Sequence, residues 1–128
     1  KFMKNIIKTT NAPAPIGPYS QAVKSGNTLY TSGQIAINPK TGKIEMDSIE
    51  LETHQVMNNM KAVLNEANMA FDDVVKTSIF ISDMNNFNRI NEIYGQYFTS
   101  NFPARETVEV NRLPKDVNLE ISMIAIKD

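Results

Sequence analysis

The residues FPARETVEVNRLPKDVNLEI, which span 102–121, decide the fold that we expect for this chain. Extended segments on either side of a Pro-Lys-Asp turn predict a strand over 105–112 and a final strand over 117–126. Apolar side chains occupy every second position of the final strand and therefore share one face: Val117, Leu119, Ile121, Met123 and Ala125. If the two strands form a hairpin about this turn, Glu120 faces Glu109.

Two charged side chains in this stretch suggest chemistry on a small acid. Arg105 begins the first strand, and arginine can grip a carboxylate through two parallel charge-assisted hydrogen bonds. Glu120 lies on the second face of the final strand beside Ile124, where it is partly desolvated and can pass protons to or from water. The residues alone also fit an interpretation without a functional role, in which Arg105 is a solvated strand-edge residue and Glu120 belongs to a solvated sheet face.

Strand and helix signals alternate along the rest of the chain. A strand is expected over 29–37, with a possible bulge at Gly33, and another over 74–81. Three prolines and a glycine over 11–18 predict a rigid loop that presents Tyr19. Apolar residues at three- and four-residue steps predict two amphipathic helices, one over about 50–67 and one that begins near Phe87. Their apolar faces carry Val56, Met57, Met60, Val63, Leu64 and Ala67 in the first, and Phe87, Ile90, Ile93, Tyr94, Tyr97 and Phe98 in the second.

This order of elements predicts the α+β class, with a single mixed β-sheet and two helices on one of its faces. The other face of the sheet is left uncovered. The chain has 128 residues and is 41% hydrophobic, so it can bury one core but not two. We therefore expect one domain over 1–128.

Composition excludes several kinds of site and partner. The chain has no cysteine and one histidine, so a thiol nucleophile, a disulfide or an imidazole-rich metal centre is not expected, and we expect no metal and no cofactor. Its 13 basic and 14 acidic residues give a net charge of -1 and no attraction to nucleic acid or anionic membrane. No apolar run is long enough to span a membrane and no signal-peptide pattern begins the chain, so we expect a cytoplasmic protein.

Several separated motifs, taken together, resemble the reactive-intermediate deaminase (Rid, or YjgF-like) family. They are APIGPYSQ at 14–21, TSGQI at 31–35, NEIYGQYF at 91–98 and the segment 103–121. Their occurrence in this order along almost the whole chain is far more specific than one short motif. The resemblance implies a chorismate-mutase-like fold and a homotrimer with ligand sites in the clefts between subunits.

The resemblance also implies an activity, the hydrolysis of reactive 2-imino acids such as 2-iminopropanoate and 2-iminobutanoate to 2-oxo acids and ammonia. In that interpretation Arg105 binds the carboxylate of the substrate and Glu120 positions or activates water. The family pocket further implies substrate-binding roles for Tyr19, Asn91 and the backbone at Ser32, Gly33 and Thr107. Many relatives carry cysteine at the position of Thr107, so thiol chemistry is not expected here.

The expected hairpin leaves Arg105 and Glu120 too far apart for a three-carbon acid. Four residues separate Arg105 from Glu109, which is on the order of 13 Å along a strand at about 3.4 Å per residue. Either the strand register differs, or the two side chains of one site come from neighbouring subunits. The intersubunit clefts of the family favour the second explanation.

The other polar residues have simpler expected roles. Glu50, Glu52, Asp72 and Asp73 are expected to be solvated charges, and His54 is expected to be a surface residue of the first long helix.

Two further functions remain open. One is an RNA-acting endoribonuclease or translation inhibitor, against which the neutral charge and the lack of basic or aromatic clusters argue. The other is a non-catalytic ligand sensor or chaperone.

Overall fold

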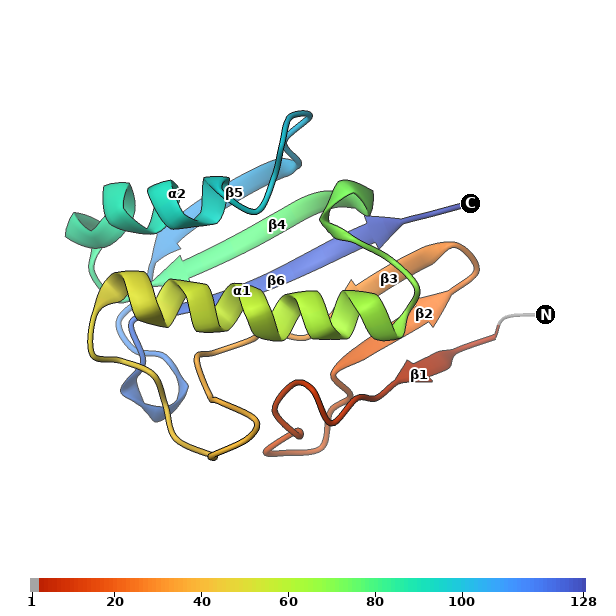
Figure 1. Ribbon diagram of the computed structural model, residues 1–128, viewed down its shortest axis with the longest axis horizontal. Helices are drawn as coiled ribbons and strands as arrows, with labels where there is room; N and C mark the ends of the chain where they lie inside the picture. The colour runs from red at the N-terminus through yellow and green to blue at the C-terminus, as the bar shows by residue number, and fades with distance from the viewer. Residues whose placement is uncertain (1–2) are drawn as a thin grey trace.

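The computed structural model describes residues 3–128 and places a six-stranded mixed sheet against two helices (Figure 1). The strand order in the sheet is β1-β2-β3-β6-β4-β5. The elements are β1 (Asn5–Ile7), β2 (Ala22–Ser25), β3 (Thr28–Thr31), α1 (Ile49–Glu66), β4 (Val74–Ile81), α2 (Phe87–Gly95), β5 (Ala104–Glu109) and β6 (Leu119–Ile126), with single 3-10 turns η1 (Phe71–Asp73), η2 (Met84–Asn86) and η3 (Pro114–Asp116).

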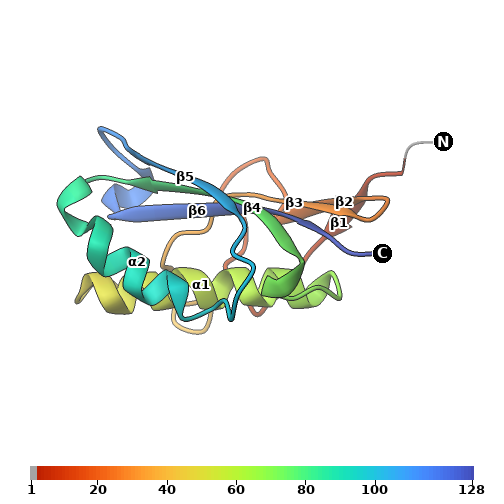
Figure 2. The ribbon, with the colours of Figure 1, turned by 90° about the horizontal axis from the view of Figure 1, so that it is seen from above.

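The molecule has two layers, which are seen edge-on in Figure 2. Both helices lie on the same side of the sheet, and the opposite side of the sheet carries no helix. The α+β class, the single mixed sheet and the two helices on one face are therefore confirmed.

Ser48 marks the beginning of the long helix α1, and Asn68 marks its end. Ser48 caps its first turn, because the Ser48 side chain accepts a hydrogen bond from the backbone N–H of Leu51 at 3.0 Å. The apolar stripe expected from the sequence lies against the sheet, and Met57, Met60 and Leu64 are fully buried. Burial of each such side chain contributes about 1.5–3 kcal/mol. After the helix, Asn68 adopts a left-handed conformation with φ 59°, which stops the helical path.

The expected hairpin between the last two strands is wrong, because β4 lies between β5 and β6. Strand β4 pairs in parallel with β5 and antiparallel with β6. The connection through α2 returns the chain to the start of β4 and so sets β5 parallel to it, as crossover connections do. The two largely apolar strands β4 and β6 thus take inner positions, and the more polar β5 takes the edge.

The strand expected over 29–37 is also shorter than the sequence suggested. Strand β3 ends at Thr31, and the following residues leave the sheet as a loop. This loop returns to β6 at one place, where Gln34 and Ile121 exchange two backbone hydrogen bonds of 2.8 and 3.1 Å. Between the pairs Tyr30–Ile124 and Gln34–Ile121, three residues oppose two of β6, so the one-residue offset of a β-bulge occurs at Gly33, as expected, although the regular strand ends before it.

The face of the sheet without helices carries several exposed apolar side chains. Residues paired across the sheet share a face, which places Ile6, Val23, Tyr30 and Ile124 in one row. Tyr30 is 52% exposed and Ile6 is 52% exposed. Apolar area of this kind on one side of a small domain is typical of an interaction surface.

Candidate active site

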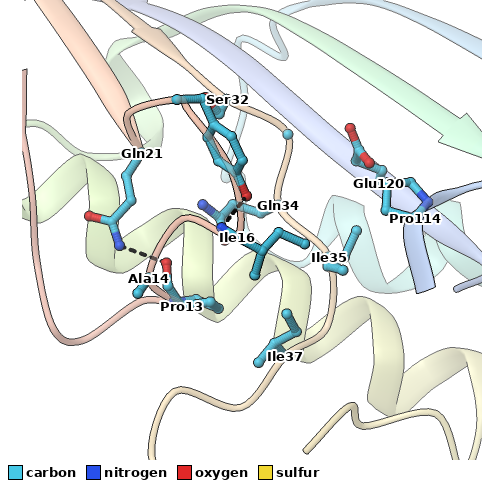
Figure 3. Close-up of a pocket in the computed structure, with 12 residues that line it drawn as sticks. Pro13, Ala14, Ile16, Gln21, Ser32, Gln34, Ile35, Ile37, Pro114 and Glu120 are labelled. Atoms are coloured by element: carbon cyan, nitrogen blue, oxygen red, sulfur yellow. Dashed lines mark hydrogen bonds between the residues drawn. The ribbon is translucent and has the colours of Figure 1, made fainter. Parts of the chain in front are cut away.

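Glu120 lies at the edge of a cavity of about 400 Å³ on the face of the sheet without helices. The alternation along β6 buries Leu119 and Ile121 under the helices and turns Glu120 the other way. Figure 3 shows Glu120 on one side of the cavity, with Ile35 and Ile37 on the loop that follows Ser32. Tyr19, Ser32 and Gly33 line this cavity with Glu120, so the structure brings together four of the residues that the sequence suggested.

Gly33 and Glu120 are in direct contact, and the contact requires glycine. A Cβ atom at position 33 would lie 2.6 Å from Cδ and 2.8 Å from Cγ of Glu120, closer than real side chains approach one another. The loop therefore covers the Glu120 carboxyl group and removes part of its hydration. This desolvation raises the pKa of Glu120 above its ordinary value of 4.5. Among the residues that line the cavity, Glu120 is the only acidic or basic one.

The loop that carries Tyr19 is held in place by Gln21, which is 2% exposed. The Gln21 side chain accepts from the backbone N–H of Thr9 at 2.7 Å and donates to the carbonyl oxygens of Thr9 and Pro13 at 3.0 and 2.8 Å. The Tyr19 hydroxyl accepts from the backbone N–H of Ile16 at 3.1 Å. The expected rigid loop is therefore built from side-chain hydrogen bonds as well as from proline.

Ser32 is less available to a ligand than expected. Its hydroxyl donates to the carbonyl oxygen of Ser20 at 2.6 Å, and its backbone N–H donates to the carbonyl oxygen of Gln21 at 2.9 Å. Ser32 therefore joins the two loops that form the cavity wall.

Arg105 lies on the other face of the sheet, where β5 passes under α2. Its Nη1 donates to Oδ1 of Asn91 at 2.7 Å. Its Cζ lies 5.7 Å from the centre of the Phe87 ring and 5.2 Å from that of Tyr94, within the range of cation–π attraction. Burial raises the pKa of Tyr94 above its ordinary value of 10.0, so this ring stays neutral beside the guanidinium group.

A second cavity, of about 350 Å³, opens beside the guanidinium group of Arg105. Phe102 and Pro103 line it together with Asn91 and Tyr94. Among residues 3–128, Asn91 is the only acceptor of a hydrogen bond from Arg105. The other N–H donors of this planar group have no partner within residues 3–128, and the group lines the cavity.

Thr107 points to the same side of β5 as Arg105, two residues further along. Its hydroxyl oxygen is buried and has no hydrogen-bond partner within the part of the chain that the structure describes. An unpartnered buried hydroxyl is uncommon in folded proteins, but Thr107 lines neither the Glu120 cavity nor the Arg105 cavity.

The expected site residues thus form two groups on opposite faces of the sheet. Phe80 of β4 pairs with Glu120, whereas Thr77 of β4 pairs with Arg105. Thr77 is fully buried under the helices and Phe80 faces the other side, because their positions differ by an odd number of residues. Arg105 and Glu120 of one chain therefore open into separate cavities. The separation of about 13 Å along a hairpin does not apply, because that hairpin does not exist.

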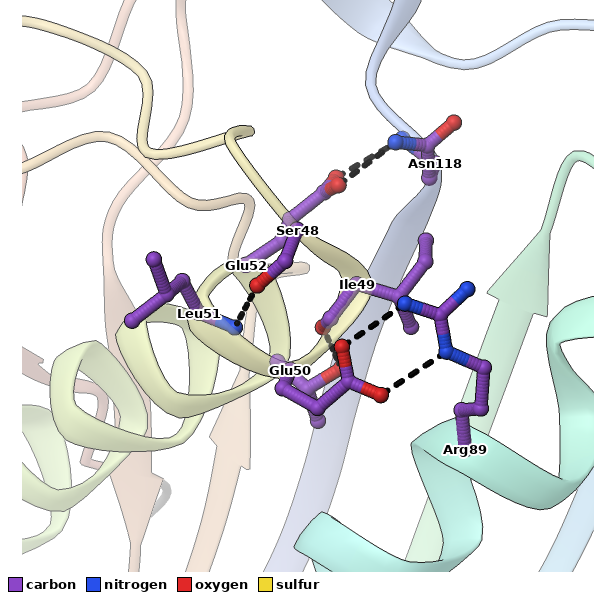
Figure 4. A network of polar contacts seen from close by, with 8 residues as sticks. Ser48, Ile49, Glu50, Leu51, Glu52, Arg89 and Asn118 are labelled. Carbon is purple, nitrogen blue, oxygen red and sulfur yellow. Dashed lines mark hydrogen bonds and ion pairs between the residues drawn. The ribbon is translucent and has the colours of Figure 1, made fainter.

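The expectation for Glu52 is wrong, because Glu52 is fully buried rather than solvated. Its carboxylate accepts hydrogen bonds from Asn118, as Figure 4 shows. Glu50 is partly exposed and forms an ion pair of 2.7 Å with Arg89. Sequence periodicity could not separate these two glutamates, since both stand in the first turns of α1.

His54 is half-buried rather than a plain surface residue. Its Nδ1 lies 2.7 Å from the hydroxyl oxygen of Tyr97, and the two rings are in contact. This contact joins α1 to the residues after α2 and lies outside both cavities.

Residues 3–128 contain no group of three or more His, Cys, Asp or Glu side chains that could hold a metal ion. No helix in the same range is long and apolar enough to cross a membrane.

Comparison with known proteins gives consistent matches along the whole chain. The model of the family described as Endoribonuclease L-PSP matches residues 9–127. A RutC family protein of Pyrococcus horikoshii is 52% identical over 126 residues, which cover 98% of this chain and 100% of that protein. A 2-iminobutanoate/2-iminopropanoate deaminase of Escherichia coli K12 is 47% identical over 128 residues, which cover 98% and 99% of the two chains.

Solved structures agree with the fold. The Rid family protein YyfA of Yersinia pestis superposes with a TM-score of 0.95 at 50% identity, covering 98% of this chain and 100% of that one. TdcF of E. coli, whose structure holds a bound serine, superposes with a TM-score of 0.93 at 42% identity, covering 97% and 99%.

Proposed function

The chain belongs to the Endoribonuclease L-PSP family, the YjgF/Rid family, and we propose that it hydrolyses reactive 2-imino acids, among them 2-iminopropanoate and 2-iminobutanoate, to 2-oxo acids and ammonia. The observation that carries the proposal is the preorganised Arg105. Its guanidinium group lies beside the rings of Phe87 and Tyr94, donates to Asn91 and lines a cavity with its other N–H groups unpaired among residues 3–128. The E. coli relative named for this activity is 47% identical to the chain.

Arg105 is the carboxylate-binding residue in this proposal. A planar guanidinium group gives a carboxylate two parallel hydrogen bonds, each worth about 1.5–3 kcal/mol net when one partner is charged. The rings of Phe87 and Tyr94 lie within cation–π distance of the group and favour its charged form at this place. Asn91 keeps the guanidinium group oriented, whereas the buried Thr107 hydroxyl does not line this cavity.

Glu120 is the acid/base residue. Its carboxylate takes a proton from a water molecule as the water oxygen bonds to C2 of the imine, and the C=N bond becomes a C–N single bond. Glu120 then gives this proton to the nitrogen of the tetrahedral intermediate. As the C–N bond breaks and ammonia leaves, the Glu120 carboxylate accepts the proton of the new hydroxyl group, so that the carbonyl group forms, and it afterwards releases this proton to solvent. One positioned acid/base group suffices for this, because a protonated imine is already electrophilic. The reaction needs neither a metal nor a cofactor.

The two groups of residues act in one site only if different subunits supply them. Arg105 and Glu120 open on opposite faces of the sheet within one chain. The exposed apolar side chains on the face that carries Glu120 favour a neighbouring copy as the partner there. The proposed assembly is a homotrimer in which the Arg105 cavity of one subunit meets the Glu120 cavity of the next, with Tyr19 and Gly33 contacting the substrate.

A direct assay tests the proposed function. An amino-acid oxidase or a threonine dehydratase generates the imine in situ, and release of ammonia and 2-oxo acid is followed with and without this protein. The proposal expects faster release with the wild-type chain and none of this gain with Glu120→Gln. Equal rates with and without the wild-type protein contradict it.

A second candidate function, a non-catalytic sensor of small carboxylates, has one observation in its favour. The structure of the relative TdcF holds a bound serine. A sensor keeps its affinity for 2-oxo acids when Glu120 becomes glutamine and shows no turnover in either form. Measurement of 2-oxobutanoate binding beside the imine assay separates the two functions.

A further inference from the structure

Glu52 is the only acidic or basic side chain among residues 3–128 that is fully buried. It stands in the first turns of α1, where the positive end of the helix dipole favours a negative charge. A buried carboxylate is costly unless hydrogen bonds satisfy both of its oxygens. Both oxygens of Glu52 accept hydrogen bonds from a single residue that lies just before β6.

That residue is Asn118, two positions before Glu120. Oε2 of Glu52 accepts from the backbone N–H of Asn118 at 2.8 Å, and Oε1 accepts from its side-chain amide at 2.6 Å (Figure 4). The carbonyl oxygen of Asn118 in turn accepts from the backbone N–H of Ser82 at 3.0 Å. The beginning of β6 is thus held from α1 and from the end of β4 at once.

The same helix holds the opposite wall of the Glu120 cavity through Asn59. The side-chain amide of Asn59, which is 1% exposed, donates to the carbonyl oxygens of Ile35 and Ile37 at 3.0 and 2.8 Å. This is the loop that carries Gly33 against the Glu120 carboxyl group. Two turns of α1 therefore fix both of the segments whose close approach defines the surroundings of Glu120.

We propose that Glu52 is a positioning residue of the active site, which acts through Asn118 to hold Glu120 against Gly33, with Asn59 holding Gly33 in place from the same helix. The inference rests on the proposed function for its kinetic consequence, but the placement of Glu120 is measurable without turnover. Side chains alternate between the two faces of a strand, so holding Asn118, just before β6, fixes the face to which Glu120 points. Loss of the hydrogen bonds between Glu52 and Asn118 lets the Glu120 side chain turn toward solvent.

The decisive comparison uses Glu52→Met, Glu52→Gln and a matched control, Thr53→Val. Methionine fills the space but leaves both donors of Asn118 without an acceptor. Glutamine keeps both hydrogen bonds, because the Asn118 amide can turn over and offer its oxygen to the new NH₂ group. Thr53 is equally buried on the same turn, and its hydroxyl bonds only to the carbonyl oxygen of Ile49, at 2.7 Å.

Steady-state kinetics give the first readout. We expect Glu52→Met to lower kcat roughly tenfold or more, as displaced catalytic groups do, while the inhibition constant of 2-oxobutanoate stays close to that of the wild type because the Arg105 cavity is intact. Glu52→Gln and Thr53→Val should keep kcat. Unchanged kcat in Glu52→Met, or an equal fall in Thr53→Val, overturns the inference.

NMR of the ¹³C-labelled glutamate carboxyl groups gives the second readout, with the Glu120 signal assigned from its loss in Glu120→Gln. In Glu52→Met the Glu120 signal should move and its titration midpoint should fall toward that of a solvated glutamate, with no such change in Glu52→Gln. An unmoved signal overturns the inference. An inactive wild-type protein refutes the proposed function alone, since the NMR comparison still decides where Glu120 points. If Glu52→Met does not fold, Asn118→Ala, which removes one of the two hydrogen bonds, replaces it in both measurements.

Discussion

Mixed oligomers test whether one site draws Arg105 and Glu120 from different chains. The perturbation is a pair of inactive variants, Arg105→Ala and Glu120→Ala, unfolded together in equal amounts and refolded. The structure places the two side chains on opposite faces of the sheet, so one chain cannot supply both to one cavity. In a randomly mixed ring each shared site has an even chance of an intact arginine and an even chance of an intact glutamate, which predicts about a quarter of the wild-type sites.

The assay is ammonia release from an imine generated in situ, with each refolded variant alone as the baseline and refolded wild-type protein as the reference. Native mass spectrometry of variants with different tags reports how many mixed assemblies form. Mixed assemblies that form in the statistical proportion but show no activity above the baseline refute the shared site. Recovery near a quarter supports it, and recovery that fails to scale with the fraction of mixed assemblies also counts against it.

Four other outcomes follow from the geometry. Arg105→Ala should abolish measurable hydrolysis, and Arg105→Lys should recover little of it. An ammonium group cannot form the two parallel hydrogen bonds of a planar guanidinium group, each worth about 1.5–3 kcal/mol. A near-native kcat/KM in Arg105→Lys would show that the carboxylate is not bound in a bidentate way. Gly33→Ala should displace the Glu120 side chain, whose Cδ lies 2.6 Å from the new Cβ, and lower kcat; an unchanged kcat would show that this close approach is not needed. Burial raises the pKa of Glu120 above 4.5, so the folded state holds this proton to higher pH than the unfolded state does, and stability falls as pH rises between the two pKa values; Glu120→Gln should therefore raise Tm at pH 8, with the difference fading near pH 4, and a Tm gain that is the same at both pH values would contradict this. Dialysis against a strong chelator should leave the activity unchanged, and a loss reversed only by a divalent ion would refute a metal-free mechanism.

Local patterns in the chain identified most elements but not their neighbours. The stripe from Val56 to Leu64 and the run Val74–Ile81 have the periods of a helix and a strand, and both elements occur where these patterns predict them. The short strands β1 and β2 were not anticipated, because three or four residues give too little periodicity. The hairpin was inferred from a turn alone, and two left-handed residues, Lys115 and Asp116, instead carry the chain away from β5.

The sequence by itself determined the class of fold, the alternation that turns Glu120 away from the core, and the residues worth testing, because these depend on side-chain type and period along one segment. Only the tertiary structure decided which of these residues lie in contact with one another. It separated Arg105 from Glu120 by inserting β4, set Gly33 against the Glu120 carboxyl group, and buried Glu52 against Asn118, 66 residues away along the chain. Each of these is a contact between distant segments, and its energy depends on the shared environment of both partners rather than on the pattern around either one.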